Sequence, residues 1–253
     1  MQKTDKEKKS MDILSIGNSF SQDAQWYLHK IAAADGVTLT TYNLYIGGCT
    51  LYKHFKNMLS EQKAYALEMN GTNTRFYVSL KEALLNREWD VVTVQQASHL
   101  STDYETYQPY LDELVAYIRK YVPKAKIAVH QTWAYEQESR RLHEVMNYGD
   151  YKEMLCDVVA SYQKAAEQVK ADYLIPSGEV FGAMLENGVE RVHRDGFHAS
   201  RGLGRYALGL VWYRILTGRD VLENTFAEFD EEISQKEQAI AKKCVQEIAE
   251  KYR

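Results

Sequence analysis

The chain has 253 residues, of which 45% are hydrophobic, and its formal charge at pH 7 is −4. This length and composition suffice for a substantial core, and lysines and arginines scattered among acids argue against a nucleic-acid partner. Three cysteines, Cys49, Cys156 and Cys244, are odd in number and far apart, which is typical neither of a disulfide framework nor of a zinc site. The sequence has no apolar run of the roughly 18 residues that a membrane helix needs.

The first ten residues are polar, include four lysines and precede no hydrophobic segment, so they are not typical of a signal peptide. We interpret residues 1–10 as a disordered polar tail. It is either an ordinary solvated tail or a tether left after removal of a signal. The compartment therefore stays open between the cytoplasm and a secreted or periplasmic location. Residues 11–253 are predicted to form a single domain.

Apolar segments of strand type alternate with amphipathic helical patterns along this domain. Strands are predicted at residues 12–16, 37–44, 90–94, 126–131 and 173–175. Helices are predicted at residues 22–34, 51–62, 79–86, 107–121, 139–170 and 200–216. Such alternation is typical of a parallel sheet with helices on both faces. We expect a three-layer α/β/α sandwich of flavodoxin-like type, with a central parallel sheet of about five strands.

Two segments depart from the alternation. Residues 65–78 contain Asn70-Gly71 between two strand-like runs, which predicts a β-hairpin. Residues 227–252 predict a long C-terminal helix whose apolar stripe either docks on the body, the interpretation we favour, or forms an oligomer contact. The local capping signals are a Ser79–Glu82 capping box, Ser200 as an N-cap and Gly218 just past a helix end.

Near the start of the chain, the strand-like run Ile13-Leu14-Ser15-Ile16 ends at Gly17 and is followed by Asn18-Ser19-Phe20-Ser21 and a helical pattern. Ser19 then lies on a sharp strand-to-helix turn, with its hydroxyl clear of the sheet. The N–H groups of the first helical turn favour negative charge at the same place. These features suit a nucleophile, although Ser19 or Ser21 could instead be a simple N-cap.

A second candidate segment is Asp195-Gly196-Phe197-His198. A carboxylate three residues before a histidine can bond to one ring nitrogen and leave the other for a serine hydroxyl. The alternatives are a turn aspartate beside a half-buried histidine, or a metal site of His193, Asp195 and His198. Arg194 within that group and the lack of a fourth ligand disfavour metal, and we expect neither a metal nor a cofactor.

Taken together, Gly17-Asn18-Ser19 after a strand, Gly48 after the second strand and Asp195-x-x-His198 resemble the SGNH/GDSL hydrolase superfamily. The resemblance covers roughly residues 12–216 and looks strongest for a bacterial branch whose first block is Gly-Asn-Ser-Phe. It implies that Ser19 is the nucleophile, His198 the general base and acid, and Asp195 the group that orients the imidazole. It also implies an oxyanion hole that includes the N–H groups of Ser19 and Gly48, although Gly47-Gly48 could be only a tight turn.

The sequence departs from the family pattern in two blocks. Asn18 stands where the family usually has aspartate, and the Gly-x-Asn-Asp block is replaced by Val94-Gln95-Gln96-Ala97-Ser98-His99. A glutamine amide can donate the hydrogen bond that the family's asparagine gives to the oxyanion. Gln95 and Gln96 should face opposite ways along a strand, and we favour Gln96. The alternative is that both glutamines only cap the ends of strands.

Asn18 and three residues after the fourth predicted strand, His130, Trp133 and Tyr135, are candidates for substrate binding, since ligands bind at this edge of open parallel sheets. Ordinary strand-end packing is the alternative for these residues. The resemblance implies a cofactor-independent serine esterase that acts on short acyl groups, with acetyl on a carbohydrate as the first choice. Two alternatives remain: another hydrolase on this scaffold, such as a thioesterase, lysophospholipase or aryl esterase, or a carbohydrate-binding protein without hydrolysis.

Overall fold

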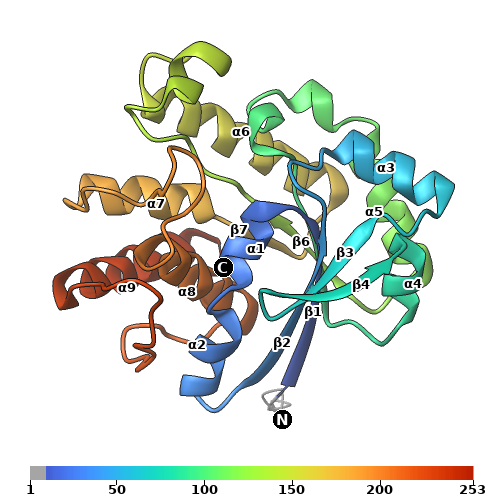
Figure 1. The fold of residues 1–253 in the computed structure, drawn as a ribbon, viewed down its shortest axis with the longest axis horizontal. Coiled ribbons are helices and arrows are strands. Elements are labelled where there is room, and N and C mark those ends of the chain that lie inside the picture. Colours follow the sequence, from blue (N-terminus) through green and yellow to red (C-terminus); the bar gives the residue numbers. More distant parts are fainter. Residues whose placement is uncertain (1–9, 253) are drawn as a thin grey trace, which may run out of the picture.

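A seven-stranded sheet runs through the centre of the molecule in the order β4-β3-β2-β1-β5-β6-β7 (Figure 1). The computed structural model describes residues 10–252. Within these residues, the five neighbouring strands β2, β1, β5, β6 and β7 pair in parallel. Strands β3 and β4 pair antiparallel at one edge of the sheet. The strands are β1 Ser10–Gly17, β2 Thr38–Tyr45, β3 Tyr65–Met69, β4 Thr72–Val78, β5 Val91–Val94, β6 Lys126–His130 and β7 Tyr173–Ile175.

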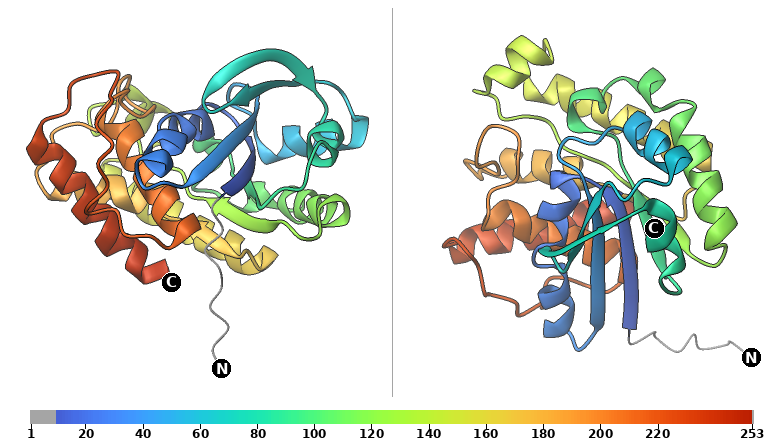
Figure 2. Two further views of the ribbon diagram at one scale, coloured as in Figure 1. Left: turned by 90° about the horizontal axis from the view of Figure 1, so that it is seen from below. Right: turned by 45° about the vertical axis from the view of Figure 1, so that its right-hand side comes forward.

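Helices cover both faces of the sheet, which confirms the predicted three-layer architecture (Figures 1 and 2). Helices α1, α2, α8 and α9 lie on one face, and α3 to α6 lie on the other, while α7 contacts α6, α8 and α9. The helices are α1 Ser19–Gln25, α2 Leu28–Ala34, α3 Leu51–Ser60, α4 Leu80–Leu85, α5 Tyr110–Tyr121, α6 Tyr151–Val169, α7 Ser177–Glu186, α8 Leu203–Thr217 and α9 Gln235–Ala249.

The predicted hairpin is confirmed, and it extends the central sheet from five strands to seven. Asn70 and Gly71 both have positive φ, at 50° and 77°, as a two-residue hairpin turn with the twist of the flanking strands requires. The hairpin pairs with β2 through β3. The Ser79–Glu82 capping box at α4 and Gly218 as the left-handed C-cap of α8 are also confirmed.

Several helix boundaries differ from the prediction. The first predicted helix begins earlier, at Ser19, and is split into α1 and α2 near Trp26. The helix predicted from residue 139 begins only at Tyr151, because Asp150 caps it after a short π-helical segment, η3 Arg141–Val145. Helix α8 begins at Leu203 rather than at Ser200, whose hydroxyl instead accepts the Gly204 N–H. Helix α7 was not predicted.

The C-terminal helix is shorter than predicted and docks on the body, as favoured. Helix α9 packs against α7 and α8, with Cys244 and Ile248 buried, and a short 3-10 segment, η4 Glu250–Tyr252, follows it. Of the predicted tail, Ser10 belongs to β1 and residues 1–9 lie outside the described residues. Within residues 10–252, none of the helices is long and apolar enough to cross a membrane. The assignment of residues 11–253 to one domain stays a prediction.

Candidate active site

The turn between β1 and α1 fixes the position of Ser19. A Cβ on Gly17 would lie 2.0 Å from the Ser21 hydroxyl, so only glycine allows the chain to turn this closely. Asn18 is the N-cap of α1 and forms a capping box with Ser21. Because Asn18 and Ser21 fill the capping roles, Ser19 is the first helical residue and its hydroxyl is not needed for capping.

The polar residues beneath this turn come from β2 and β3. The Ser21 hydroxyl lies 2.8 Å from the Asn43 side-chain oxygen, and the Asn43 amide donates to Glu68 at 2.8 Å. Burial raises the pKa of the Glu68 carboxyl to about 7, against hydrogen bonds from Asn43 and Gln22 that lower it. The turn is thus connected to the neighbouring strands by buried hydrogen bonds.

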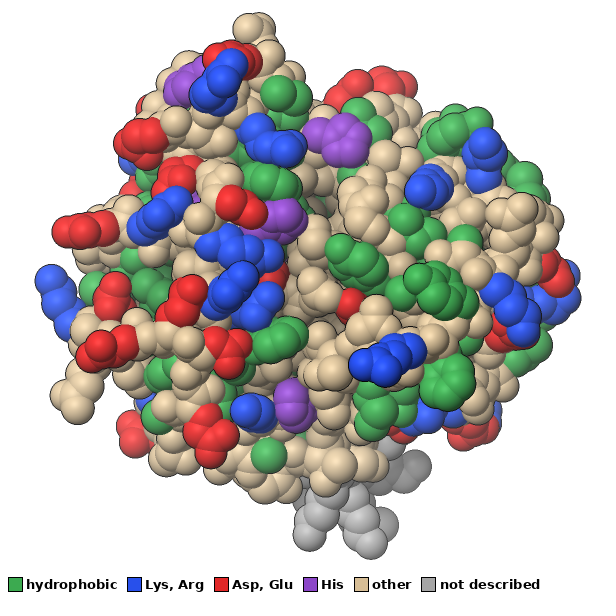
Figure 3. Space-filling view, in the orientation of Figure 1, with side chains coloured by type: hydrophobic (Ala, Val, Ile, Leu, Met, Phe, Trp, Pro, Cys, Tyr) green, Lys and Arg blue, Asp and Glu red, His purple; other side chains and the backbone are tan. Residues whose placement is uncertain are grey.

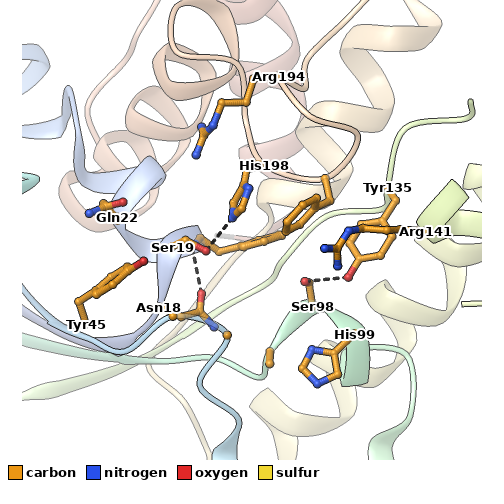
Figure 4. Close-up of a pocket in the computed structure, with 15 residues that line it drawn as sticks. Asn18, Ser19, Gln22, Tyr45, Ser98, His99, Tyr135, Arg141, Arg194 and His198 are labelled. Carbon is orange, nitrogen blue, oxygen red and sulfur yellow. Dashed lines mark hydrogen bonds between the residues drawn. The ribbon is translucent and has the colours of Figure 1, made fainter. Parts of the chain in front are cut away.

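The structure brings Ser19 and the Asp195–His198 segment together, although 179 residues separate the serine from the histidine (Figure 4). Ser19 Oγ lies 2.9 Å from His198 Nε2, and His198 Nδ1 lies 2.8 Å from Asp195 Oδ2. Partial burial raises the pKa of the Asp195 carboxyl, but the His198 N–H and imidazole outweigh this effect and lower it overall. A carboxylate, an imidazole and a hydroxyl therefore form one continuous hydrogen-bonded chain.

Aromatic residues hold the histidine loop against α1. The Trp133 indole N–H donates to the Phe197 carbonyl at 2.8 Å, and the Trp133 ring stacks on Phe20 with centroids 4.1 Å apart. Phe197 in turn contacts the His198 ring at 3.9 Å between centroids. Because Trp133 is fully buried, it positions this loop rather than offering a surface to a ligand. The expectation that Trp133 binds substrate is corrected accordingly.

A pocket of about 400 Å³ opens over Ser19 and His198 at the carboxyl end of the parallel strands. Of the residues expected to bind substrate, Asn18 and Tyr135 line it. His130 and Trp133 do not, and neither do Gln95 and Gln96. The lining residues are Asn18, Ser19, Phe20, Gln22, Tyr45, Gly47, Gly48, Ala97, Ser98, His99, Tyr135, Arg141, Arg194, Phe197 and His198.

Gln95 and His130 form a buried network behind the pocket wall. His130 Nδ1 lies 2.9 Å from the Gln95 side-chain oxygen, and His130 Nε2 lies 3.1 Å from the Ser177 hydroxyl. The Gln95 amide donates to the Asn18 side-chain oxygen at 3.0 Å. Burial lowers the pKa of His130 to about 3, so this imidazole is neutral. The expected substrate contact of His130 is corrected, because the side chain supports Asn18 from within the core.

Gln96 also points away from the pocket. Its side-chain oxygen accepts the N–H groups of Leu51 and Ala97, each at 2.9 Å, and its amide donates to Thr106. Because these bonds occupy both ends of the amide in a fully buried position, Gln96 is not available to an oxyanion. The preference for Gln96 over Gln95 is therefore corrected.

Two backbone N–H groups remain as candidate oxyanion donors. Ser19 is in the first turn of α1, where N–H groups have no partner within the helix. Gly48 follows β2 with a left-handed φ of 60° and lines the pocket. Within residues 10–252, neither N–H has a hydrogen-bond partner. Two donors thus lie in the lining of the pocket that holds the Ser19 hydroxyl.

Several residues that line the pocket were not identified from the sequence. They include Gln22, Tyr45, Ser98, His99, Arg141, Arg194 and Phe197. Ser98, His99, Arg194 and Phe197 lie inside motifs singled out for other residues, so proximity to a motif was an available signal. Arg141 lies in a segment predicted to be the interior of a helix, and no sequence pattern marks it.

His193 lies apart from the pocket that contains His198. Its Nε2–H donates to the Ala134 carbonyl at 3.0 Å, and burial lowers its pKa to about 4. Arg194, the residue between His193 and Asp195, pairs instead with the buried Asp23 at 2.9 Å. Across residues 10–252, no group of three or more His, Cys, Asp or Glu residues is arranged to hold a metal ion.

A family model matches residues 12–248 of the chain: the domain of unknown function DUF4886. The chain belongs to the DUF4886 family. A DUF4886 family protein from Bacteroides uniformis with a solved crystal structure is 34% identical in sequence to this chain. The match covers 95% of each of the two chains, with a TM-score of 0.88. Comparison with curated proteins gives no significant match.

More distant solved structures relate this DUF4886 chain to the SGNH fold. A candidate SGNH hydrolase from Slackia heliotrinireducens is 21% identical, covers 82% of this chain and 99% of its own, and has a TM-score of 0.58. A candidate GDSL-like lipase from Parabacteroides merdae is 17% identical, covers 83% and 97%, and has a TM-score of 0.56. The resemblance to the SGNH/GDSL superfamily is thereby confirmed at the level of the fold.

Proposed function

We propose that this DUF4886 protein is a serine hydrolase of the SGNH type that cleaves short-chain esters. The observation that carries the proposal is the continuous chain from Ser19 Oγ through His198 to Asp195, with distances of 2.9 and 2.8 Å, inside a pocket. A nucleophile bonded to a base that a third group orients is the general arrangement for acyl transfer. The SGNH fold of the distant structures adds support.

In the first half of the reaction, Ser19 Oγ attacks the ester carbonyl while His198 Nε2 takes the hydroxyl proton. Asp195 keeps the Nδ1–H tautomer and stabilises the imidazolium. The tetrahedral intermediate collapses when His198 returns the proton to the leaving alcohol, which breaks the ester bond and leaves an acyl group on Ser19. In the second half, a water molecule repeats the attack and releases the acid.

The oxyanion of each intermediate would be bound by the N–H groups of Ser19 and Gly48. Loss of one such donor typically costs about 10²–10³ in turnover. Neither Gln95 nor Gln96 lines the pocket, so neither supplies the third donor that the family's asparagine provides. The Gln95–Asn18 contact instead assigns Gln95 a positioning role, in which it holds the N-cap residue next to Ser19.

The substrate class that we favour is a short acyl ester, with acetyl on a carbohydrate as the first choice. A pocket of about 400 Å³ lined by hydroxyls, amides, guanidinium groups and aromatic rings suits a polar alcohol better than a long alkyl chain. Thioesters and lysophospholipids are the alternatives within the same chemistry.

The direct test is hydrolysis of 4-nitrophenyl acetate by the full chain and by Ser19→Ala, with Ser60→Ala on the exposed end of α3 as a matched control. We expect Ser19→Ala to lose at least about 10³ in kcat, because the covalent step disappears, and Ser60→Ala to match the wild type. Covalent labelling by a fluorophosphonate, located by mass spectrometry, should fall on Ser19. Equal rates for wild type and Ser19→Ala would contradict the proposal.

The substrate class is tested with a panel of acetylated sugars, acyl-thioesters and lysophospholipids. We expect the highest kcat/KM for acetylated sugars, and no measurable turnover of any of the panel by Ser19→Ala. A higher kcat/KM for thioesters or lysophospholipids would leave the serine mechanism in place and would assign the protein to that substrate class instead of acetylated sugars.

A further inference from the structure

The two ends of the pocket differ in chemistry. Figure 4 shows Gln22 and Tyr45 on one side of the Ser19–His198 pair, and Ser98, His99, Tyr135 and Arg141 on the other. The second group comes from the chain after β5 and after β6. None of the residues that line the pocket is an aspartate or a glutamate. On this face of the molecule, Lys and Arg side chains lie together with Asp and Glu side chains on one side of the centre (Figure 3).

Arg141 differs from the other arginines near the pocket. Arg194 is paired with Asp23 at 2.9 Å, and Arg140 holds Glu144 through two bonds of 2.9 and 2.8 Å. The Arg141 guanidinium instead lies over the Phe197 ring, 4.1 Å from its centroid, and has no carboxylate partner within residues 10–252. Stacking restricts the guanidinium, while its N–H donors stay open to a ligand.

A pair of hydroxyls beside Arg141 supplies a further donor. Ser98 Oγ and Tyr135 OH lie 2.9 Å apart, and both residues are buried while lining the pocket. Two hydroxyls carry two hydrogens, and their mutual bond uses one of them. Within the described part of the chain, the second hydrogen has no other protein acceptor. Because both residues line the pocket, this hydrogen can be donated to an acceptor atom of a bound ligand.

The protonation of His99 affects the net charge of this end of the pocket. Partial desolvation lowers the pKa of its imidazole, and the neighbouring Arg141 lowers it further, which favours the neutral form of His99. One guanidinium charge and one spare hydroxyl donor then match a monoanion with two oxygens better than a doubly charged group. A carboxylate meets both requirements, because it accepts from a guanidinium and a hydroxyl at once.

We propose that the ester hydrolysed at Ser19 carries a carboxylate, which binds to Arg141 and to the Ser98–Tyr135 hydroxyl pair. This inference rests on the proposed serine hydrolase function and narrows its substrate class to anionic esters, such as a short acyl group on an acidic sugar. The carboxylate can belong to the alcohol or to the acyl half of the ester, and the experiment separates these two sources.

Two matched pairs of esters test the proposal. On the alcohol side, 4-acetoxybenzoate is compared with its methyl ester; on the acyl side, mono-4-nitrophenyl adipate is compared with 4-nitrophenyl methyl adipate. The measured quantity is the ratio of kcat/KM for the charged ester to that for the neutral ester, after subtraction of uncatalysed hydrolysis. We expect Arg141→Gln to lower this ratio about tenfold or more in one of the pairs, because a charge-assisted hydrogen bond is lost. The pair that responds identifies the half of the ester that carries the anion.

Arg140→Gln is the matched control, since Arg140 is the adjacent exposed arginine and is held by Glu144 outside the pocket. Its ratio should equal that of the wild type, and Arg141→Lys should recover part of the loss. Tyr135→Phe should lower the same ratio by a smaller factor. Ratios within twofold of the wild type for Arg141→Gln in both pairs would overturn the carboxylate site while leaving the serine hydrolase intact.

A binding measurement keeps the two proposals distinguishable. The same four esters are titrated into Ser19→Ala and Ser19→Ala/Arg141→Gln, and binding is followed by NMR, so that no turnover is required. Tighter binding of a charged ester than of its neutral partner, lost in the double variant, supports the carboxylate site even if none of the four esters is turned over. Equal binding of charged and neutral esters by both variants overturns it.

Discussion

The β1–α1 turn and the ends of β5 and β6 contribute to the same region of the molecule in different ways. At the turn, Gly17, Asn18 and Ser19 take the positions that their order along the chain suggests. At the strand ends, the polar residues with the most suggestive chemistry, Gln95 and His130, are buried behind the pocket wall, and the pocket is lined by residues a few positions further along.

The two regions differ in how far apart along the chain the contacting residues lie. Residues two or three positions apart close the capping box of α1, so the direction of Ser19 is set locally. The direction of Gln95 depends on His130 of the neighbouring strand β6 and on Asn18, which follows the neighbouring strand β1. Local motifs can therefore be interpreted from sequence, whereas strand-end side chains take their direction from neighbours that the sequence does not place.

After Ser19→Ala, the largest effect is expected at the other locally encoded motif, Asp195-x-x-His198. Asp195→Asn should lower kcat by about 10²–10⁴ with the fold intact, because the imidazole loses its tautomer control and its counter-charge. Steady-state kinetics and circular dichroism of the variant test this. An unchanged kcat would show that a group other than Asp195 orients His198.

The oxyanion hole offers a paired test with two glycines. Gly48 and Gly36 have similar left-handed φ values of 60° and 69° and open space around them, but only Gly48 lines the pocket. Each alanine substitution should cost about 1–2 kcal/mol of stability. Gly48→Ala should also lower kcat about tenfold or more, through a displaced N–H donor.

Chemical denaturation and turnover, measured on both variants, separate the two effects. If Gly36→Ala and Gly48→Ala changed kcat equally, the N–H of Gly48 would have no role beyond the fold.

A smaller effect distinguishes the two strand-end glutamines. Gln95→Met removes one hydrogen bond from the Asn18 side-chain oxygen and leaves His130 Nδ1 without its partner, whereas Gln96→Met frees the N–H groups of Leu51 and Ala97. Each should lose about 1–3 kcal/mol of stability per orphaned buried group. Only Gln95→Met should in addition lower kcat, by up to about tenfold, because Asn18 caps the helix that begins at Ser19.

The measurement is kcat at a temperature where both variants are fully folded, with denaturation curves for each. A larger loss of kcat in Gln96→Met than in Gln95→Met would reverse the assigned roles and return Gln96 to the candidate oxyanion donors.

Much of the architecture follows from alternation and turn chemistry. The five parallel strands, the Asn70-Gly71 hairpin and the Gly218 cap were all predicted, because each depends on residues close together in the chain. Helix α7 and the late start of α6 were not predicted. Apolar periodicity continues through residues 139–150, and only the local cap at Asp150 ends the irregular segment before α6.

The sequence alone determined the two motifs and their local geometry: a serine on a strand-to-helix turn and an aspartate three residues before a histidine. Their 2.9 Å contact was decided by the tertiary structure, because Trp133 after β6 and Asp23 of α1 hold the loop that contains His198 over the β1–α1 turn. Packing also decided that Gln95, Gln96, His130 and Trp133 point into the core while Arg141 faces the pocket without a carboxylate partner among the described residues. Side-chain direction at a strand end depends on neighbouring strands and helices, which no single stretch of sequence contains.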